Sequence, residues 1–315
     1  MVRLIFFFLI FLSSCSSLQK WAVRRSSPVF HEASEQLTKE DSWEFFRKSA
    51  PGNLKFIELV YLTDPDNLGL LPAVIKAHAG YAYGVPETLV FEDEILGREN
   101  TSHRSEAIHH YTRALDYGVF YLGKRGVSRE DLLTLPEEKL REKLREETDG
   151  DDLVAMIYMA QSWGSLINLQ KDNVALVAQV PRVKILVDHV CQMKPEIEHN
   201  ICAIFLAQYE ASRPRMLGGN PDRARELYRE AMEKNPYHLL IPVNLIQYMT
   251  IPAMDEDEYE QLAPRLRAEF VEWAKKDRSN LKDESRYHKH RDLNLYNAIA
   301  RKRFDIIERN KKKIF

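Results

Sequence analysis

The fold of this chain is predicted by one stretch of its sequence, Ala224-Arg225-Glu226-Leu227-Tyr228-Arg229-Glu230-Ala231-Met232-Glu233-Lys234-Asn235-Pro236. Ala224, Tyr228 and Ala231 stand four and then three positions apart, which places their side chains on one face of an α-helix. The two alanines allow a partner helix to approach closely, and the tyrosine fills the space between helices. The proline ends the helix, so that the chain can turn back. This stretch therefore predicts one member of a packed helix pair.

The same spacing resembles the second helix of a tetratricopeptide repeat, and it recurs elsewhere in the chain. Weaker copies occur at Ala107, Tyr111 and Ala114, and at Val183, Val187, Val190 and Pro195. Gly80 and Tyr83 suit the first helix of such a repeat. Inserted stretches separate these helices, so the repeats are irregular. The resemblance predicts an all-α fold, a tetratricopeptide-like helical repeat array in the form of an α-α superhelix.

Residues 137–148 differ from the rest of the chain because they are charged almost all round. Only Leu140 and Leu144 give this segment an apolar side. Ion pairs between residues four apart stabilise such a helix in water. We therefore expect an exposed helix or linker, which would separate an N-terminal helical part from the main array.

The N-terminus has the pattern of an export signal. Arg3 precedes an unbroken apolar run at 4–12, and small residues follow at Ser13 and Ser14. A helix that spans a bilayer needs about 20 apolar residues, so a permanent transmembrane anchor is the weaker alternative. The end of the signal, Leu12-Ser13-Ser14-Cys15, resembles a bacterial lipobox. That resemblance implies lipidation of Cys15 and cleavage before it; a chance thiol near an ordinary cleavage site is the alternative.

These features divide the chain into three parts. Residues 1–14 are the predicted lipoprotein signal peptide, 15–34 a tether, and 35–315 the helical-repeat domain. Two acyl chains would give a durable anchor where one does not. Ser16 stands where an aspartate would favour retention in the inner membrane. We therefore expect a protein anchored by lipid to the outer membrane, on its periplasmic side.

Charge and motifs exclude several classes of function. The 45 Lys and Arg residues and 47 Asp and Glu residues are dispersed along the chain and leave a net charge of −2, which speaks against a nucleic-acid partner. Lys311-Lys312-Lys313 is interpreted as a frayed, solvated terminus. Two groups of histidines occur, at His109-His110 and at His288 and His290. No further residues at helical spacing would complete a metal-ligand set around either group, so we interpret them as surface histidines and expect no metal. The sequence contains no recognisable catalytic or cofactor motif, so no cofactor and no enzymatic activity are predicted.

Two cysteines remain after the signal, Cys191 and Cys202, with Pro195 between them. If Pro195 lies in a turn, both cysteines could sit near the same end of neighbouring helices, and an oxidising compartment would permit a bond. Both also lie in apolar helical stripes. Two free, buried thiols are the preferred interpretation, and a disulfide is the alternative.

A longer stretch carries a more specific resemblance. Arg213-Pro214-Arg215-Met216-Leu217-Gly218-Gly219-Asn220-Pro221-Asp222-Arg223-Ala224 is similar to an element of the TatT lipoproteins that are associated with TRAP transporters. Further similarity lies at 72–84, 151–167 and 294–303. The loop also has a local explanation: Gly218 and Gly219 allow a tight backbone after one helix, and Asn220 with Pro221 begins the next. Asn220 departs from the family pattern, in which an aspartate is usual at this position.

The resemblance implies an accessory component of a TRAP-type transport system that binds the periplasmic solute-binding protein. It also implies a homo-oligomer, for which a trimer is one candidate, and a cleft for a hydrophobic or organic-anion ligand. The expected ligand-binding residues are Tyr81, Tyr83, Trp163, Asn168, Arg215, Asn294 and Tyr296. Core packing is the alternative role for the aromatic residues, and capping of nearby helix carbonyls is the alternative for Arg215. An envelope scaffold lipoprotein that only joins proteins is the alternative function.

Overall fold

Helices make up all the regular structure that the computed structural model describes, which covers residues 24–25, 29–30, 32–33, 35–99, 101–213, 218–275 and 287–315. The predicted all-α fold is therefore confirmed for these ranges. The main helices are α2 (Trp43–Thr63), α3 (Leu71–Gly84), α4 (Pro86–Ile95), α5 (Ser102–Lys124), α6 (Arg129–Thr134), α7 (Glu137–Glu147), α8 (Leu153–Leu169), α9 (Val174–Val177), α10 (Val180–Met193), α11 (Ile197–Ala211), α12 (Pro221–Lys234), α13 (Leu240–Leu245), α14 (Glu256–Ala274) and α15 (Asn294–Ile314). Short helical turns are η1 (Leu37–Lys39), η2 (Leu68–Leu70), η4 (Ile246–Thr250) and η5 (His288–Leu293). The predicted signal peptide and Cys15 lie outside the described residues.

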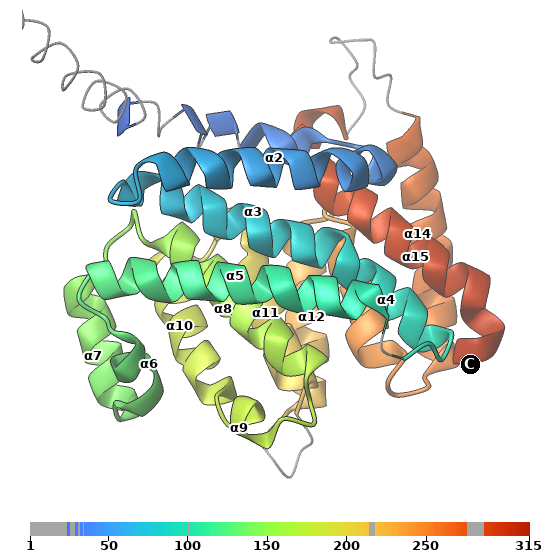
Figure 1. Ribbon diagram of the computed structural model, residues 1–315. Coiled ribbons are helices and arrows are strands. Elements are labelled where there is room, and N and C mark those ends of the chain that lie inside the picture. The colour runs from blue at the N-terminus through green and yellow to red at the C-terminus, as the bar shows by residue number, and fades with distance from the viewer. Residues whose placement is uncertain are drawn as a thin grey trace, which may run out of the picture.

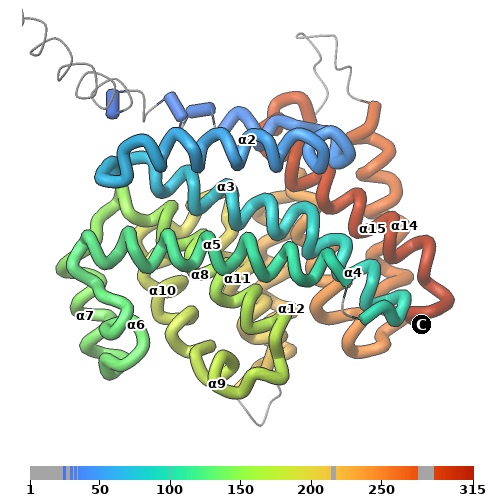
Figure 2. Tube along the Cα trace, viewed as in Figure 1, coloured from blue at the N-terminus to red at the C-terminus, as the bar shows by residue number. Residues whose placement is uncertain are grey.

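Helices α2, α3 and α5 run side by side and form the upper layer in Figure 1. The second layer contains α8, α10, α11 and α12. In Figure 2 the chain leaves the first layer at the end of α5 and reaches α8 through α6 and α7. Helix α3 contacts both α5 and α8, so it connects the two layers. Helices α14 and α15 close one end of the molecule, where α15 packs against α4 and α13.

Two large apolar clusters form most of the core. One joins α3, α5, α8 and α10, and its fully buried members include Val74, Met156 and Leu186. The other joins α2, α13, α14 and α15 and includes Phe270 and Ile307. Burial of this apolar surface is the main force that holds the helices together.

Helix α12, which contains most of the stretch 224–236, packs as predicted. Ala224, Tyr228 and Ala231 of α12 are all buried, with Tyr228 fully inaccessible to solvent. Their face contacts α11. The related residues Ala107, Tyr111 and Ala114 of α5 are also fully buried. The predicted packing role of these residues is confirmed, whereas a regular tetratricopeptide-like superhelix remains a prediction.

The charged segment 137–148 forms α7 and the residue that ends it. Leu140 and Leu144 are fully buried, and α7 packs against α10. The Arg141 guanidinium adds an ion pair across this contact, 3.1 Å from the Asp188 carboxylate. The helix was predicted correctly, but its interpretation as a linker is wrong, because its narrow apolar side is seated in the core.

A disulfide joins Cys191 of α10 to Cys202 of α11, and the two Cα atoms lie 5.7 Å apart. The preferred expectation of two free thiols is therefore wrong. Helix α10 ends at Met193 and α11 begins at Ile197, so a short connection that contains Pro195 brings the two cysteines together. The first turn of α11 is unusual, since Glu198, His199 and Asn200 all have left-handed backbone with φ of 47°, 58° and 66°.

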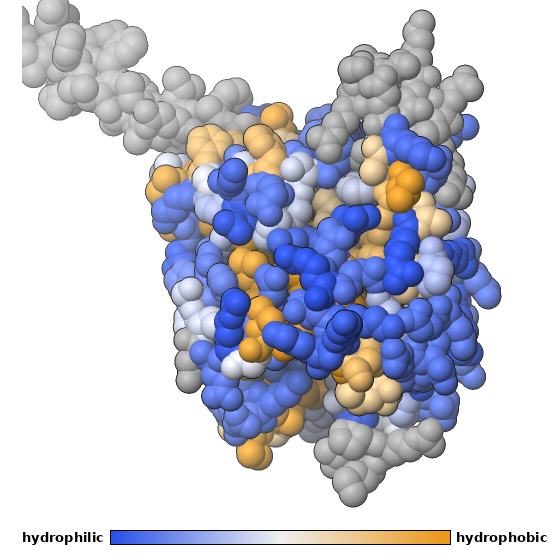
Figure 3. All heavy atoms as spheres, turned by 90° about the vertical axis from the view of Figure 1, so that its right-hand side faces the viewer, coloured by the Kyte–Doolittle hydropathy of each residue, from blue (hydrophilic) through white to orange (hydrophobic). Residues whose placement is uncertain are grey.

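The end of the molecule that carries α14 and α15 is mainly hydrophilic, and its apolar residues form separate patches (Figure 3). Ion pairs connect these two helices: the Arg267 guanidinium lies 2.7 Å from the Glu308 carboxylate, and the Lys311 ammonium lies 2.9 Å from Glu256. Because α15 continues to Ile314, the expectation of a frayed C-terminus is wrong. None of the described helices combines the length and the hydropathy needed to cross a membrane.

Candidate functional site

A cavity of about 850 Å³ opens between the two large apolar clusters. Its walls come from α2, α3, α8, α10, α11, α13 and α15. Most of the lining is apolar, and it includes Leu54, Ile57, Val183, Ile204, Phe205 and Ile299. A volume of this size is typical of sites that bind small molecules, which range over about 300–1,000 Å³.

Small residues on α3 and α8 leave this space open. A Cβ atom added to Gly80 of α3 would meet no heavy atom of the described residues within 4 Å. At Gly164 of α8 the nearest described atom would be a methyl carbon of Val183, 3.7 Å away. Ala73 and Ala77 of α3 also line the cavity. At Ala73, Ala77 and Gly80, α3 therefore presents almost no side-chain volume to the cavity, whereas its larger lining residues are Lys76, Tyr81 and Tyr83.

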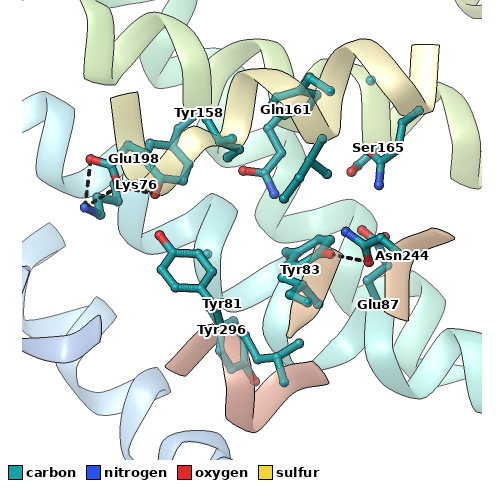
Figure 4. A pocket seen from close by; sticks show the side chains of 18 of the residues that line it. Lys76, Tyr81, Tyr83, Glu87, Tyr158, Gln161, Ser165, Glu198, Asn244 and Tyr296 are labelled. Carbon is teal, nitrogen blue, oxygen red and sulfur yellow. Dashed lines mark hydrogen bonds and ion pairs between the residues drawn. The ribbon is translucent and has the colours of Figure 1, made fainter. Parts of the chain in front are cut away.

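One polar group in the cavity is built around a half-buried ion pair. The Lys76 ammonium donates hydrogen bonds to both Glu198 carboxylate oxygens, at 3.0 and 2.8 Å. The Tyr158 hydroxyl donates to the same carboxylate at 2.7 Å (Figure 4). Burial favours the neutral form of Glu198, but Lys76 and the Tyr158 hydroxyl outweigh it and lower the pKa of this carboxyl. The left-handed turn at the start of α11 places Glu198 at this wall.

The wall beside this ion pair carries aromatic rings from α15 and from the segment before α13. The Tyr296 ring packs against the His238 ring, with centroids 5.1 Å apart and planes tilted by 48°. Burial raises the pKa of the Tyr296 hydroxyl, and the Glu198 carboxylate raises it further. His238 is 2% exposed, and its burial lowers its pKa to about 3. These rings are therefore uncharged at neutral pH.

A second polar group lies at the other end of the view in Figure 4. The Tyr83 hydroxyl donates to Asn244 Oδ1 at 3.1 Å. Glu87 is buried, and its carboxylate accepts hydrogen bonds from the hydroxyls of Tyr111 and Tyr248. Asn244 Nδ2 has no hydrogen-bond partner among the described residues, and the same is true of Gln161 Oε1 on α8.

The structure places four of the seven predicted ligand-binding residues at the cavity: Tyr81, Tyr83, Asn168 and Tyr296. Tyr81 is anchored by its hydroxyl, which donates to the Glu106 carboxylate at 2.6 Å. Arg215 lies outside the described residues. Of the predicted residues, the cavity thus brings together some that are 215 positions apart in the sequence, Tyr81 and Tyr296.

The other two predicted residues have structural contacts away from the cavity lining. Trp163 is buried in the core, and its indole nitrogen donates to Gln179 Oε1 at 2.9 Å. Asn294 donates to the Lys39 carbonyl oxygen at 3.1 Å and accepts a bond from the Trp273 indole. Asn294 therefore fastens the start of α15 to η1.

The predicted glycine loop is shaped by backbone contacts. Gly218 has φ of +81°, a left-handed conformation that glycine adopts without strain. A Cβ atom on Gly219 would lie 1.8 Å from the Arg213 carbonyl oxygen. Asn220 Oδ1 accepts a bond from the Arg223 amide at 3.0 Å and so caps α12, with Pro221 as the first helical residue. The predicted start of α12 is confirmed.

Sequence reasoning missed most of the polar residues of the cavity: Lys76, Tyr158, Gln161, Glu198 and Asn244. Lys76 had a visible signal, because it is the one charged residue in the otherwise apolar stretch at 68–77. No comparable signal marks Glu198, since its position depends on the left-handed turn.

Two of the histidines form a buried pair outside the cavity lining. His78 Nδ1 and His110 Nδ1 lie 3.0 Å apart. Burial and the neighbouring histidine lower the pKa of His78 to about 4, and burial together with His109 lowers that of His110 to about 4. The expectation of surface histidines therefore holds for His109, which is exposed, and fails for the half-buried His110. Within the described ranges, no three or more His, Cys, Asp or Glu residues are grouped as a metal site would require.

Comparison with known proteins identifies the family of this chain. No curated protein matches the chain. The family model described as "TRAP transporter T-component" matches residues 39–273, which include most of the helices that form the cavity. This family is a transporter accessory component rather than a known enzyme family. The chain therefore belongs to the TRAP transporter T-component (TatT) family.

Proposed function

We propose that this chain is a lipid-anchored periplasmic accessory component of a TRAP-type transport system. In this proposal it binds the solute receptor of that system and holds a hydrophobic or organic-anion ligand in the cavity. The observation that carries the proposal is a cavity of about 850 Å³ with a mostly apolar lining in a member of this family. Isolated apolar cavities are uncommon in close-packed cores, which rarely leave voids larger than a water molecule.

The partner side of the proposal follows the family. A tetratricopeptide-like array offers an extended surface to a second protein, and a homo-oligomer such as a trimer would present several copies of it. The test is a pull-down of the TRAP solute receptor by the full-length chain, followed by mass spectrometry of any small molecule that copurifies. The Gly80→Phe variant, which fills the cavity, should still capture the receptor but lose the small molecule. Recovery of neither receptor nor ligand with the folded, wild-type chain would contradict the proposal.

The anchor rests on the lipobox at Leu12-Ser13-Ser14-Cys15. We expect the mature protein to begin at Cys15, to carry acyl chains there and to face the periplasm from the outer membrane. Cys15→Ala should release the protein from the membrane fraction, while Ser17→Ala, a matched change two residues on, should leave it attached. An intact mass of the membrane form that shows an unmodified Cys15 would refute the anchor.

A second function, a scaffold that joins envelope proteins without a ligand, is favoured by the outer face of α2. Phe45, Leu59 and Leu62 are 49–60% exposed there, and exposed apolar residues in a group mark sites of protein contact. The two functions differ in one measurable respect. A scaffold would retain its partners without binding any apolar probe, whereas the transport component binds both.

A further inference from the structure

The polar atoms of the cavity point to the chemical class of its ligand. We infer that the cavity selects an uncharged amphipathic molecule, whose apolar body fills the cavity and whose polar group both donates and accepts hydrogen bonds, as a primary amide or an alcohol does. This inference rests on the proposed ligand-binding function and narrows it, because it disfavours the organic anion.

The charged groups buried at the cavity already have partners. Lys76 and Glu198 are 13% and 12% exposed and are paired with each other. The buried Glu87 carboxylate is stabilised by two tyrosine hydroxyls. The fully buried Arg303 guanidinium packs over the Tyr83 ring, but it is not part of the lining and already donates to Thr88, Gln247 and the Tyr83 carbonyl oxygen. Among the described lining residues, an anion would therefore find no buried cation without a partner. Burying an unpaired charge is strongly unfavourable.

Cations also occur elsewhere along the lining, but they lie nearer to solvent. The Lys184 ammonium is 2.5 Å from Asp188, and the Arg213 guanidinium is 3.6 Å from Glu210. Lys171 is exposed at the end of α8, where water screens its charge. These side chains therefore do not offset the cost of transferring a carboxylate from water into the cavity.

Two amide side chains of the lining carry a complementary pair of atoms without partners among the described residues. Gln161 is 8% exposed and Asn244 is 0% exposed, and both side chains extend from α8 and α13 toward the same part of the cavity (Figure 4). Gln161 Oε1 is an acceptor and Asn244 Nδ2 is a donor, and neither has a partner among the described residues. Buried polar atoms are nearly always paired in folded proteins, so these two atoms mark a place where a ligand group would complete the hydrogen bonding.

The two atoms together define what the ligand group must supply. Gln161 Oε1 requires a donor, which an ionised carboxylate and an ester both lack. Asn244 Nδ2 requires an acceptor, which an amide, an alcohol and an ester all have. An amide or an alcohol satisfies both requirements. A site built to hydrogen-bond a polar group discriminates strongly against analogues that leave its own buried atoms unpaired.

The test compares three probes that share one apolar chain: dodecanamide, methyl dodecanoate and dodecanoate. Each is used to displace the uncharged fluorophore N-phenyl-1-naphthylamine from the purified full-length chain after removal of copurified lipid. The measurements are made at about pH 8, where dodecanoate is ionised. Dodecanamide should displace the fluorophore at a concentration at least about tenfold lower than the other two, the factor that corresponds to about 1.4 kcal/mol.

Substitutions of Gln161 locate the origin of this preference. Gln161→Leu and Gln161→Met have similar size and no acceptor, and each should reduce the advantage of the amide to within about threefold while still binding the fluorophore. Gln192→Leu is the matched control, because Gln192 is exposed on α10 and is not part of the lining. Thermal melting of each variant confirms that the fold is retained, and the second variant serves if the first does not fold.

The outcomes separate this inference from the proposed function. If the fluorophore binds but dodecanoate competes as well as dodecanamide, the inference is overturned and the ligand-binding function stands. The inference is also overturned if the amide keeps its full advantage in a folded Gln161 variant. If the fluorophore does not bind the wild-type chain at all, the ligand-binding function itself fails.

Discussion

Gly80 of α3 offers the most direct test of the cavity, because it can be enlarged without a clash. Its Cβ position is open, with no described heavy atom within 4 Å, and its backbone is helical. Gly80→Ala should stabilise the protein by about 0.5–1 kcal/mol, since glycine in a helix interior costs about this much relative to alanine. Gly80→Phe directs an aromatic ring into the cavity; a cavity of about 150 Å³ accommodates benzene, and about 850 Å³ is available here.

Two assays separate the effects of these substitutions. Urea denaturation gives the free energy of unfolding, and titration with N-phenyl-1-naphthylamine gives the affinity of the cavity. If the added ring displaces the equivalent of two buried methylene groups, at about 0.8 kcal/mol each, affinity should fall about tenfold or more. Gly52 of α2 is the matched control: its Cβ position is equally open, yet it is exposed and is not part of the lining. Gly52→Ala and Gly52→Phe should leave the affinity unchanged.

Two results would refute this reasoning. If folded Gly80→Phe binds the fluorophore as tightly as the wild-type chain, the cavity is not the binding site. If Gly80→Ala lowers the free energy of unfolding by more than about 1 kcal/mol, the space beside α3 is not open.

Three further predictions concern the framework around the cavity. Gly219→Ala should lower the free energy of unfolding by about 2–4 kcal/mol in urea denaturation, because its Cβ atom would lie 1.8 Å from a backbone carbonyl oxygen; an unchanged midpoint would show that the loop can shift. The Cys191–Cys202 bond closes a loop with a sequence separation of 11, and its reduction should lower the free energy of unfolding by about 3 kcal/mol. The stability of the Cys191→Ser/Cys202→Ser variant should not change when the reductant is added. His78 and His110 have pKa values of about 4 in the folded chain, below the ordinary 6.5. Their contribution to the free energy of unfolding is therefore complete above pH 6.5 and is lost as the pH falls toward 4. The loss is up to about 1.4 kcal/mol per pH unit for each histidine. His78→Asn should flatten this slope between pH 7 and pH 5, and an unchanged slope would exclude His78 as its source.

The helical framework could be predicted from the sequence because its signals are local. The spacing of Ala224, Tyr228 and Ala231 depends only on the helix period, and the start of α12 depends on the adjacent pair Asn220 and Pro221. The disulfide was missed for a different reason. Whether Cys191 faces Cys202 depends on how α10 and α11 cross, which local spacing does not specify.

The cavity was harder to predict because its defining contacts join distant parts of the chain. Tyr83 and Tyr296 lie in segments that resemble the family, which predicts them as ligand-binding residues, and they line the cavity. The Lys76–Glu198 ion pair spans 122 positions. It also depends on left-handed backbone at Glu198, His199 and Asn200. No sequence pattern predicts this conformation here, because glycine is the residue usually expected to adopt it.

The disulfide has a practical consequence for anyone who makes this protein in a host cell. The loop that it closes, from Cys191 to Cys202, contains the whole left-handed turn of Glu198, His199 and Asn200, and such backbone costs roughly 1–2 kcal/mol per residue. In a reducing cytosol the bond does not persist, so recombinant chain harvested from that compartment would hold this turn without its covalent clamp. Preparations intended for ligand or receptor experiments should therefore be exported or reoxidised, and titrated for free thiols before use.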